Sequence, residues 1–513
     1  MGVARVHAVA LSGVSGSLVE VEADLAQGLP TFTLVGLPDT AVAEARDRVR
    51  AAVVNSGAPW PGKRITVGLS PASLPKVGSG FDLAIAAAVL LAAGTLPGTS
   101  LARSVLLGEL GLDGRVRPVR GVLPAVVAAV RWGADRVVVP AVQAAEAQLV
   151  EGVSVLGVRS LAELLAELRG DPPPASALEA ELIEPPPRAT DLAVLDLGQV
   201  VGQLLGRRAV EVAAAGGHHA IFIGEPGCGK TMLAERLPGL LPDLDREQAL
   251  EVTAVHSVAG VLAPGSPLVT RPPFSAPHHT ATVAALVGGG SGVLRPGAAS
   301  VAHRGVLFLD EAPEFHSGVL DALRQPMEGG EVRLARARSA ITYPARFQLV
   351  LAANPCPCGR GTTVGGVAAG CECPRVVRRR YLARISGPLL DRVDLRLRLE
   401  PLSRSELFDL ARTPEASAPV AARVAAVRHR QRERLHGTPW RCMAEVPGPE
   451  LRARWPVPRA ALATLVQGSR TGTLTARSAD KVLRLAWTIA DLAGRGVPVR
   501  DDVDEALLLR EMA

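Results

Sequence analysis

The stretch AIFIGEPGCGKT, residues 220–231, decides the fold of this chain. Its first four residues are apolar, as in a buried strand, and residues 232–237 have the pattern of a helix. The glycine-rich turn between them matches G-x-x-x-x-G-K-[ST] in the strand–loop–helix setting that this phosphate-binding pattern requires. In such a loop the backbone N–H groups close around phosphates, Lys230 reaches the β and γ groups, and Thr231 holds Mg²⁺. The sequence therefore predicts an α/β fold built around a nucleotide site.

Two further apolar runs end in polar side chains that a nucleotide site can use. VLFL, residues 306–309, leads to Asp310 and Glu311, a pair suited to place one carboxylate on Mg²⁺ and one on the attacking water. FQLVLAA, residues 347–353, leads to Asn354, which we expect to touch the γ-phosphate or that water. Together these residues predict ATP hydrolysis. The expected nucleotide-binding residues are Gly224, Glu225, Pro226, Gly227, Cys228, Gly229, Lys230, Thr231 and Asp310, of which Thr231 and Asp310 hold Mg²⁺.

Composition limits the classes of protein to consider. The chain has 513 residues, too many for one ordinary domain, and 48% of them are hydrophobic, so large cores can form. Aromatic residues make up only 3%, so rows of stacked rings for binding single strands lack material, although arginine planes could substitute. Of the 56 basic residues 52 are arginines, which codon bias in a GC-rich genome explains most simply. The net charge of +6 fits a polyanionic partner without proving one.

Apolar runs in the sequence are too short for a membrane span. The longest, residues 83–94, falls short of the roughly 18–20 residues that a span needs. Residues 18–24 alternate like a strand, and no basic stretch followed by a long apolar segment precedes them. We therefore expect a soluble, cytoplasmic protein that does not contact a membrane.

A proline-rich stretch divides the chain. Residues 170–191, GDPPPASALEAELIEPPPRATD, contain two runs of three prolines and little that could pack, so we expect an exposed linker. The expected organisation is an N-terminal α/β domain (1–169), the linker (170–191), an ATPase core with a cysteine-rich insertion (192–400), and a helical C-terminal lid (401–513).

Longer motifs carry a resemblance to a known family. GGHHAIFIGEPGCGKTMLAERLPGLLP, FSAPHHTAT, HRGVLFLDEAPEF, ALRQPMEGGEV, YPARFQLVLAANPCPCG and ISGPLLDRVDL resemble the magnesium-chelatase-like AAA+ ATPases of bacteria, the YifB/ComM family. The resemblance covers nearly the whole chain. It implies the sensor-1 position for Asn354, an arginine finger on a neighbouring subunit's nucleotide for Arg392, and the sensor-2 position for Arg477. A surface salt bridge of Arg392 with Asp391 or Asp394 is the alternative.

The same resemblance implies a function. Because an arginine finger acts across a subunit interface, we expect a homo-hexameric ring that uses ATP and Mg²⁺. The ring would be a motor on branched or single-stranded DNA of any sequence, acting as a helicase in branch migration during recombination or natural transformation. The alternative is an ATPase that remodels a protein partner, as the ATPase subunits of magnesium chelatase do.

The N-terminal domain resembles Lon-type (S5-type) proteases. PKVGSG, residues 75–80, resembles the Lon stretch around its nucleophile, and residues 108–121 resemble the stretch that leads to its lysine. In this register the nucleophile's place falls on Gly80 and the lysine's on Leu123, neither of which can do the chemistry. Ser79 lies one residue early, and we expect it to cap the helix that begins near residue 81. The resemblance therefore implies a Lon-like fold without peptidase activity.

Two C-x-C pairs form a candidate metal site. Cys356 and Cys358 are separated from Cys371 and Cys373 by a glycine-rich dozen residues. Four thiolates could hold zinc tetrahedrally, although the usual structural spacing is C-x₂₋₄-C. We favour zinc over an inert or redox-sensitive loop.

An arginine-rich stretch lies between the Asp310 and Asn354 strands. EVRLARARSAIT, residues 331–342, alternates like a β-hairpin with Arg333, Arg336 and Arg338 on or near its turn. In motors of this family such a hairpin, with a second insertion near residues 288–297, points into a central pore. Arginines there would neutralise DNA phosphates without reading sequence, whereas the alternative is a solvated hairpin. For His278 and His279, before the second insertion, a structural role and a ligand contact both remain open.

Overall fold

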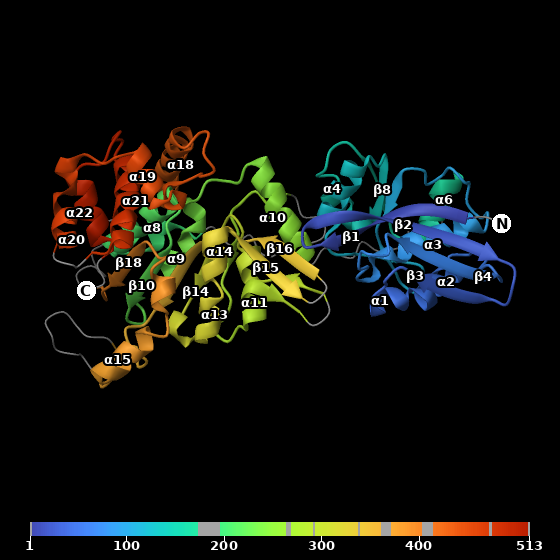
Figure 1. Ribbon diagram of the computed structural model, residues 1–513, viewed down its shortest axis with the longest axis horizontal. Coiled ribbons are helices and arrows are strands. Elements are labelled where there is room, and N and C mark those ends of the chain that lie inside the picture. The colour runs from blue at the N-terminus through green and yellow to red at the C-terminus, as the bar shows by residue number, and fades with distance from the viewer. Residues whose placement is uncertain are drawn as a thin grey trace.

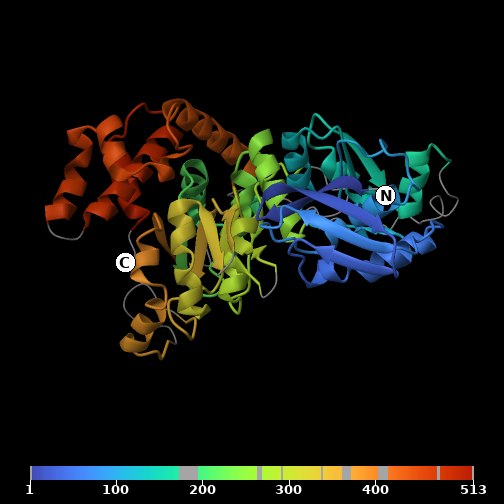
Figure 2. The ribbon, with the colours of Figure 1, turned by 45° about the vertical axis from the view of Figure 1, so that its right-hand side comes forward.

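The computed structural model describes residues 3–172, 195–262, 268–290, 293–336, 339–360, 371–402, 414–470 and 474–510. These residues form an elongated molecule with an N-terminal α/β unit at one end, a parallel sheet in the middle and C-terminal helices at the other end (Figures 1 and 2). Most of the linker predicted at residues 170–191 lies outside the described residues.

The N-terminal unit is built on a seven-stranded mixed sheet in the order β3-β4-β2-β1-β5-β8-β9. Alternate residues of β1 face two different cores: Ala8 lies in the core under α3, whereas Val9 lies in the core under α4. This alternation follows from the period of two in a strand. The elements are β1 (Val3–Ser12), β2 (Ser15–Ala26), β3 (Thr31–Val35), β4 (Arg64–Ser70), β5 (Ser104–Leu106), β8 (Arg136–Pro140), β9 (Ser154–Val158), α2 (Ala45–Asn55), α3 (Asp82–Ala92), α4 (Val122–Trp132) and α6 (Leu161–Arg169).

The central sheet has five parallel strands in the order β11-β14-β17-β10-β18. Every residue of β10, β14 and β17 is buried, as expected for strands covered on both faces. Because the strands are parallel, their C-terminal ends share one edge of the sheet. The elements are β10 (Ala220–Gly224), β11 (Phe274–Ser275), β14 (Val306–Leu309), β17 (Gln348–Ala353), β18 (Leu395–Leu399), α8 (Leu204–Gly216), α9 (Lys230–Arg236) and α10 (Arg246–Ala259). The predicted α/β class with a parallel sheet around the phosphate-binding loop is confirmed.

Two short hairpins project from this part of the chain. β15 (Glu331–Arg336) pairs with β16 (Ser339–Pro344), so the hairpin predicted for this stretch is confirmed. A smaller hairpin joins β12 (Gly288–Gly289) and β13 (Arg295–Pro296). The hydroxyl of Tyr343 on β16 donates to the carbonyl of Leu294 at 2.8 Å, which ties the two hairpins together.

The C-terminal part is helical, as expected. It contains α18 (Ser417–Arg434), α19 (Gly448–Arg454), α20 (Ala463–Arg470), α21 (Ala476–Leu492) and α22 (Arg500–Leu508), and shares one hydrophobic core with α8 and one face of the central sheet. Shorter elements are α1 (Thr40–Ala43), α5 (Ala144–Ala147), β6 (Glu109–Leu110), β7 (Val116–Arg117), α11 (Val283–Val287), α12 (Ala298–Val301), α13 (Ser317–Asp321), α14 (Arg324–Gly329), α15 (Arg375–Leu382) and α16 (Gly387–Leu390). Within the described ranges, no helix combines the length and the apolar character needed to cross a bilayer.

The N-terminal unit contacts the central part through α4 and α10, which lie side by side (Figures 1 and 2). The hydroxyl of Ser257 on α10 donates to the buried carboxylate of Glu146, which also accepts from the backbone N–H of Leu123 at 2.9 Å. The turn between β1 and β2 packs on the β15–β16 hairpin, since a Cβ on Gly13 would lie 2.8 Å from the carbonyl oxygen of Thr342. The hairpin is therefore supported from the N-terminal unit.

The capping role predicted for Ser79 is wrong. α3 begins at Asp82, and its N-terminus receives no side-chain cap from residue 79 or from Phe81. The Ser79 hydroxyl instead donates to the carboxylate of Glu109, which folding brings next to it. Lys76 is buried and donates to the carbonyl of Pro71, so the serine and the lysine of this turn have different partners.

Candidate active site

The loop between β10 and α9 has the backbone shape of a phosphate cradle. Gly227 and Gly229 adopt left-handed conformations, with φ of 81° and 90°, and the backbone turns sharply there before α9 begins at Lys230. Residues with a side chain rarely adopt this conformation, so the two glycines are required by the path of the loop. The open space beside both Cα atoms leaves their backbone accessible to a phosphate.

Lys230 is held inside this loop. Its ammonium group donates to the carbonyls of Gly224 at 2.7 Å and Glu225 at 2.9 Å, and to Oδ1 of Asn354 at 3.1 Å. The side chain is buried, and burial lowers the pKa of Lys230 below its ordinary value. The predicted lysine and the predicted sensor residue, 124 residues apart, therefore meet at one point.

The predicted magnesium ligands also meet. The hydroxyl of Thr231 donates to Oδ2 of Asp310 at 2.8 Å, and the backbone N–H of Glu311 donates to Oδ1 of the same carboxylate at 2.8 Å. Hydroxyl and carboxylate oxygens are ligands that Mg²⁺ accepts, with phosphate and water oxygens completing its shell. The side chains of Thr231 and Asp310 are therefore suitable ligands for Mg²⁺ at the phosphate-binding loop.

Glu311 combines an unusual backbone with an unexpected partner. Its φ is 50°, a left-handed value that a residue with a side chain adopts at a cost of about 1–3 kcal/mol. Its carboxylate lies 3.2 Å from Nδ1 of His279, whose ring is tilted by 34° against that of His278 with 4.1 Å between their centroids. His278 itself bonds to the Thr280 hydroxyl at 2.9 Å.

His279 is a neighbour of the candidate base Glu311 that the sequence did not identify. The sequence allows both a structural role and a ligand contact for His279, and the structure places its Nδ1 3.2 Å from the carboxylate of Glu311. The signal was present but weak: His279 follows β11, the strand that adjoins β14, at the same edge of the sheet. β11 has only two residues, too few for a recognisable strand pattern.

Arg392 and Arg477 do not lie at this site. Both line a cavity of about 1110 Å³ that faces the opposite edge of the central sheet. The residues that open or precede four of the strands, His219, Gly305, Gln348 and Asp394, line the same cavity. The five residues of β10 separate this edge from the phosphate-binding loop by roughly 16 Å. Within one chain, both arginines therefore lie at the sheet edge opposite to the loop that would hold the phosphates.

Neither of the expected acidic partners pairs with Arg392. Its guanidinium forms an ion pair with Glu328 and donates to the carbonyl of Pro388 at 2.6 Å. The exposed guanidinium of Arg477 lies 3.9 Å from Asp391, so the two arginines flank the same short segment. Glu328 belongs to α14, and no sequence pattern places that helix beside residue 392.

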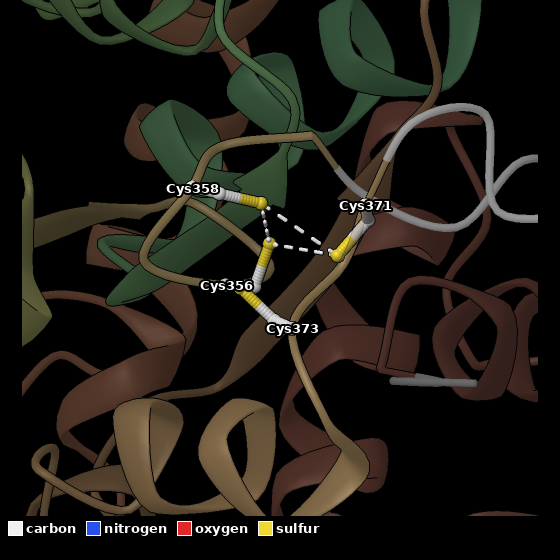
Figure 3. A group of neighbouring side chains, drawn as sticks. All are labelled: Cys356, Cys358, Cys371 and Cys373. Atoms are coloured by element: carbon white, nitrogen blue, oxygen red, sulfur yellow. Dashed lines mark hydrogen bonds between the residues drawn. The ribbon is translucent and has the colours of Figure 1, made fainter.

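The structure brings all four predicted cysteines together (Figure 3). Their Sγ atoms all lie within 4.8 Å of one another. Of the three hairpin arginines, Arg333 is exposed and pairs with Glu331 through a 2.6 Å bond, whereas Arg338 and the side chain of Arg336 lie outside the described residues.

Comparisons with known families agree with this architecture. Residues 196–407 match the family described as magnesium chelatase, subunit ChlI. Residues 21–143 match the family described as subunit ChlI of Mg-chelatase, and residues 414–510 match the family of the ChlI C-terminal region.

Curated relatives match over the full length. An uncharacterized protein of Mycobacterium tuberculosis is 53% identical over 513 residues, covering 100% of this chain and 99% of that protein. The uncharacterized protein YifB of Escherichia coli is 41% identical over 99% of this chain and 97% of its own length. Competence protein ComM of Haemophilus influenzae is 40% identical over 100% and 98%. A shorter match of 104 residues, 31% identical, joins the chain to Lon protease 2 of Bacillus subtilis.

Proposed function

Because this chain belongs to the YifB/ComM family of magnesium-chelatase-like AAA+ ATPases, we propose that it is an ATP-driven motor acting on DNA in the cytoplasm. One observation carries the ATPase half of the proposal. Lys230, Asn354 and Asp310 come from separate strands or loops and converge on one phosphate-binding loop. Structural ion pairs seldom assemble a lysine, a threonine, a paired carboxylate and an amide at the same sheet edge.

Each residue has a distinct role in the proposed reaction. Bound Mg²⁺ would neutralise charge on the β- and γ-phosphates, with Thr231 and Asp310 as its protein ligands. Lys230 exchanges the carbonyls that it contacts here for phosphate oxygens, which stabilises charge on the transferred group. Glu311 accepts a proton from the attacking water, and Asn354 orients that water or the γ-phosphate.

The two arginines act on a neighbouring copy of the chain. Arg392 and Arg477 share one cavity on the far edge of the sheet, so in a ring this face would meet the nucleotide of the next subunit. We assign the finger role to Arg392, which would leave Glu328 for phosphate, and a supporting sensor role to Arg477. A ring of six subunits is the assembly that we propose.

The DNA half of the proposal rests on the hairpin and on a relative. β15 and β16 present Arg333, and the sequence adds Arg336 and Arg338 at the turn. Arginines without base contacts bind the phosphate backbone irrespective of sequence. ComM of Haemophilus influenzae is named a competence protein, which supports a role in natural transformation or recombination, as a helicase that drives branch migration.

A second candidate is remodelling of a protein partner. The three matched families are named for a magnesium chelatase subunit, and that match favours this candidate. DNA binding distinguishes the two functions, because an ATPase that remodels a protein needs no contacts with the phosphates of DNA. We also assign zinc to the four cysteines, beside ATP and Mg²⁺.

Salt-dependent DNA binding by a hairpin variant tests the proposal. Replacing Arg333, Arg336 and Arg338 by alanine should weaken binding equally for unrelated sequences, and lower the salt slope by roughly one unit for each phosphate that an arginine no longer neutralises. A matched variant removes three exposed arginines from the N-terminal unit, Arg46, Arg50 and Arg169, and should keep the parent slope. If the hairpin variant binds DNA as the parent does, the protein-remodelling function is favoured instead.

A further inference from the structure

Four cysteine side chains form a compact group (Figure 3). The Sγ atom of Cys356 lies 3.2 Å from that of Cys358 and 3.5 Å from that of Cys371, and the Cys358 and Cys371 sulfurs are 3.6 Å apart. With Cys373, all four sulfurs lie within 4.8 Å of one another. Tetrahedral zinc with bonds of about 2.3 Å places its sulfurs roughly 3.8 Å apart. The group therefore has the size of a single four-sulfur metal site.

The ligand set favours zinc over other ions. Four thiolates without imidazole or carboxylate are soft ligands, which select zinc, copper(I) or iron–sulfur clusters and reject Mg²⁺ and Ca²⁺. One ion at the centre of four sulfurs leaves no open position, which is the arrangement of a structural zinc site. None of the four cysteines forms a disulfide.

The first cysteine pair lies between two contacts with the phosphate-binding loop. Asn354, two residues before Cys356, accepts the hydrogen bond from Lys230. Gly359, one residue after Cys358, packs against Pro226, since a Cβ at Gly359 would lie 2.8 Å from Cγ of Pro226. The backbone closes the turn between these contacts through a 3.0 Å bond from the N–H of Gly359 to the carbonyl of Cys356.

The second cysteine pair joins this turn to α15. Cys373 immediately precedes Pro374, the residue before α15 begins at Arg375, and Cys371 lies two residues earlier. A metal bound by all four sulfurs would therefore cross-link the end of β17 to the start of α15, so that metal binding is coupled to the folding of these two elements.

We propose that Cys356, Cys358, Cys371 and Cys373 form a structural zinc site that holds the turn after β17 against the phosphate-binding loop. Bound zinc then fixes the positions of Asn354 and Pro226, and through them the phosphate-binding loop. The zinc site stands on the cysteine geometry alone, whereas its effect on ATP rests on the proposed ATPase function.

Metal analysis tests the site without any nucleotide. Full-length protein purified without chelator should carry about one zinc per chain, and cobalt(II) put in its place should show the thiolate-to-cobalt absorption of a tetrahedral sulfur site. Replacing Cys371 and Cys373 by serine should abolish both signals, whereas Cys442→Ala, which removes a buried cysteine elsewhere, should keep them. Protein without zinc, or with iron in its place, would overturn the zinc site.

Nucleotide binding tests the contact with the phosphate loop. The double serine variant should bind ATP more weakly and turn it over up to ~10²-fold more slowly, the loss expected when catalytic groups shift by about 1 Å. Gly359→Ala keeps all four sulfur ligands but disturbs the contact with Pro226, because its methyl group would lie 2.8 Å from Cγ of Pro226 and its φ of 73° disfavours a side chain. It should retain zinc and still lose turnover. Parent-like turnover in both variants would refute the bracing role, while a parent protein that holds zinc but hydrolyses no ATP would refute only the ATPase.

Discussion

Glu311 is the residue on which the proposed chemistry depends most. Its backbone is left-handed and follows the end of β14. Its side chain is half exposed to solvent, and its carboxylate lies 3.2 Å from Nδ1 of His279. We expect Glu311→Gln to bind ATP and to hydrolyse it at least ~10²-fold more slowly, because the amide cannot take a proton from water. Single-turnover hydrolysis and ATP binding, measured on the same protein, check this.

A neighbouring glutamate serves as the control. Glu314 lies three residues further on and pairs with Arg384 at 3.3 Å. Glu314→Gln should hydrolyse ATP nearly as the parent does. Near-normal turnover by Glu311→Gln would remove that residue from its role.

In the proposed reaction, we infer that His279 acts through Glu311 as a positioning residue. Since its Nδ1 lies 3.2 Å from the carboxylate, we expect His279→Ala to lower kcat by roughly 10-fold or more, with little change in KM for ATP. His279→Asn, which can still donate a hydrogen bond, should recover part of kcat. His278→Ala is the control, because His278 bonds to Thr280 and not to Glu311. Equal losses in both alanine variants would mean that the contact between the two histidine rings, and not the contact with Glu311, determines the rate.

At this scale, the predicted residues that the structure brings together are those that local spacing defines. Lys230 and Thr231 followed from a contiguous loop, and Asp310 and Asn354 from polar residues that end apolar strands. The contact of His279 with Glu311 and that of Glu328 with Arg392 could not be inferred from the sequence. They join residues that are 32 and 64 positions apart, respectively, and that only tertiary packing brings together.

Among the elements, strands with strong apolar runs were predictable and a cap was not. β10, β14 and β17 are fully buried, so their composition alone marks them. Serine is a typical N-cap residue, but the hydroxyl of Ser79 donates to Glu109, 30 residues away, and not to the N-terminus of α3. Tertiary hydrogen bonds of this kind override local capping preference.

The contact between α4 and α10 includes the buried carboxyl group of Glu146. Among the described residues, no basic side chain pairs with this group. Burial raises the pKa of Glu146 above its ordinary value of 4.5, although Ser257 and Leu123 donate to it. The folded state then binds more protons than the unfolded state above about pH 4.5, so this contribution to stability is lost as pH rises through the raised pKa.

Glu146→Gln should reveal this pH dependence. The amide keeps an acceptor for Leu123 and does not ionise, so the Tm of the variant relative to the parent should be higher at pH 8 than at pH 5. Thermal unfolding of both proteins across this range measures the difference. Glu151→Gln, at an exposed ion pair with Arg246, should give a flat difference. If the Tm of Glu146→Gln relative to the parent falls as pH rises, the raised pKa of Glu146 is contradicted.

In the whole molecule, the two halves of the proposed active site lie on opposite edges of one sheet. The phosphate-binding loop is at the C-terminal ends of the strands, and Arg392 and Arg477 line the cavity at the other ends. The sequence named these arginines through family resemblance, but the edge on which they lie depends on how α14, α21 and the sheet pack together. Spacing along the chain carries no such information.

Mixing two inactive variants tests whether a site is shared between subunits. Arg392→Ala retains the phosphate loop, and Lys230→Ala retains the arginine. Rings assembled from both should recover part of the ATPase that each lacks alone. Lys230→Ala mixed with Glu311→Gln is the control, because both residues belong to the same side of the site and no interface can be complete. Absence of recovery in co-assembled Arg392 and Lys230 rings would argue against action across subunits.

The most direct test of the central claim is ATP turnover by the purified protein with and without four-way DNA. A DNA motor should hydrolyse ATP faster when four-way or forked DNA is added, equally for unrelated sequences and less at high salt. Glu311→Gln should show no such stimulation. ATP turnover that no form of DNA changes, in protein that hydrolyses ATP on its own, would contradict the account.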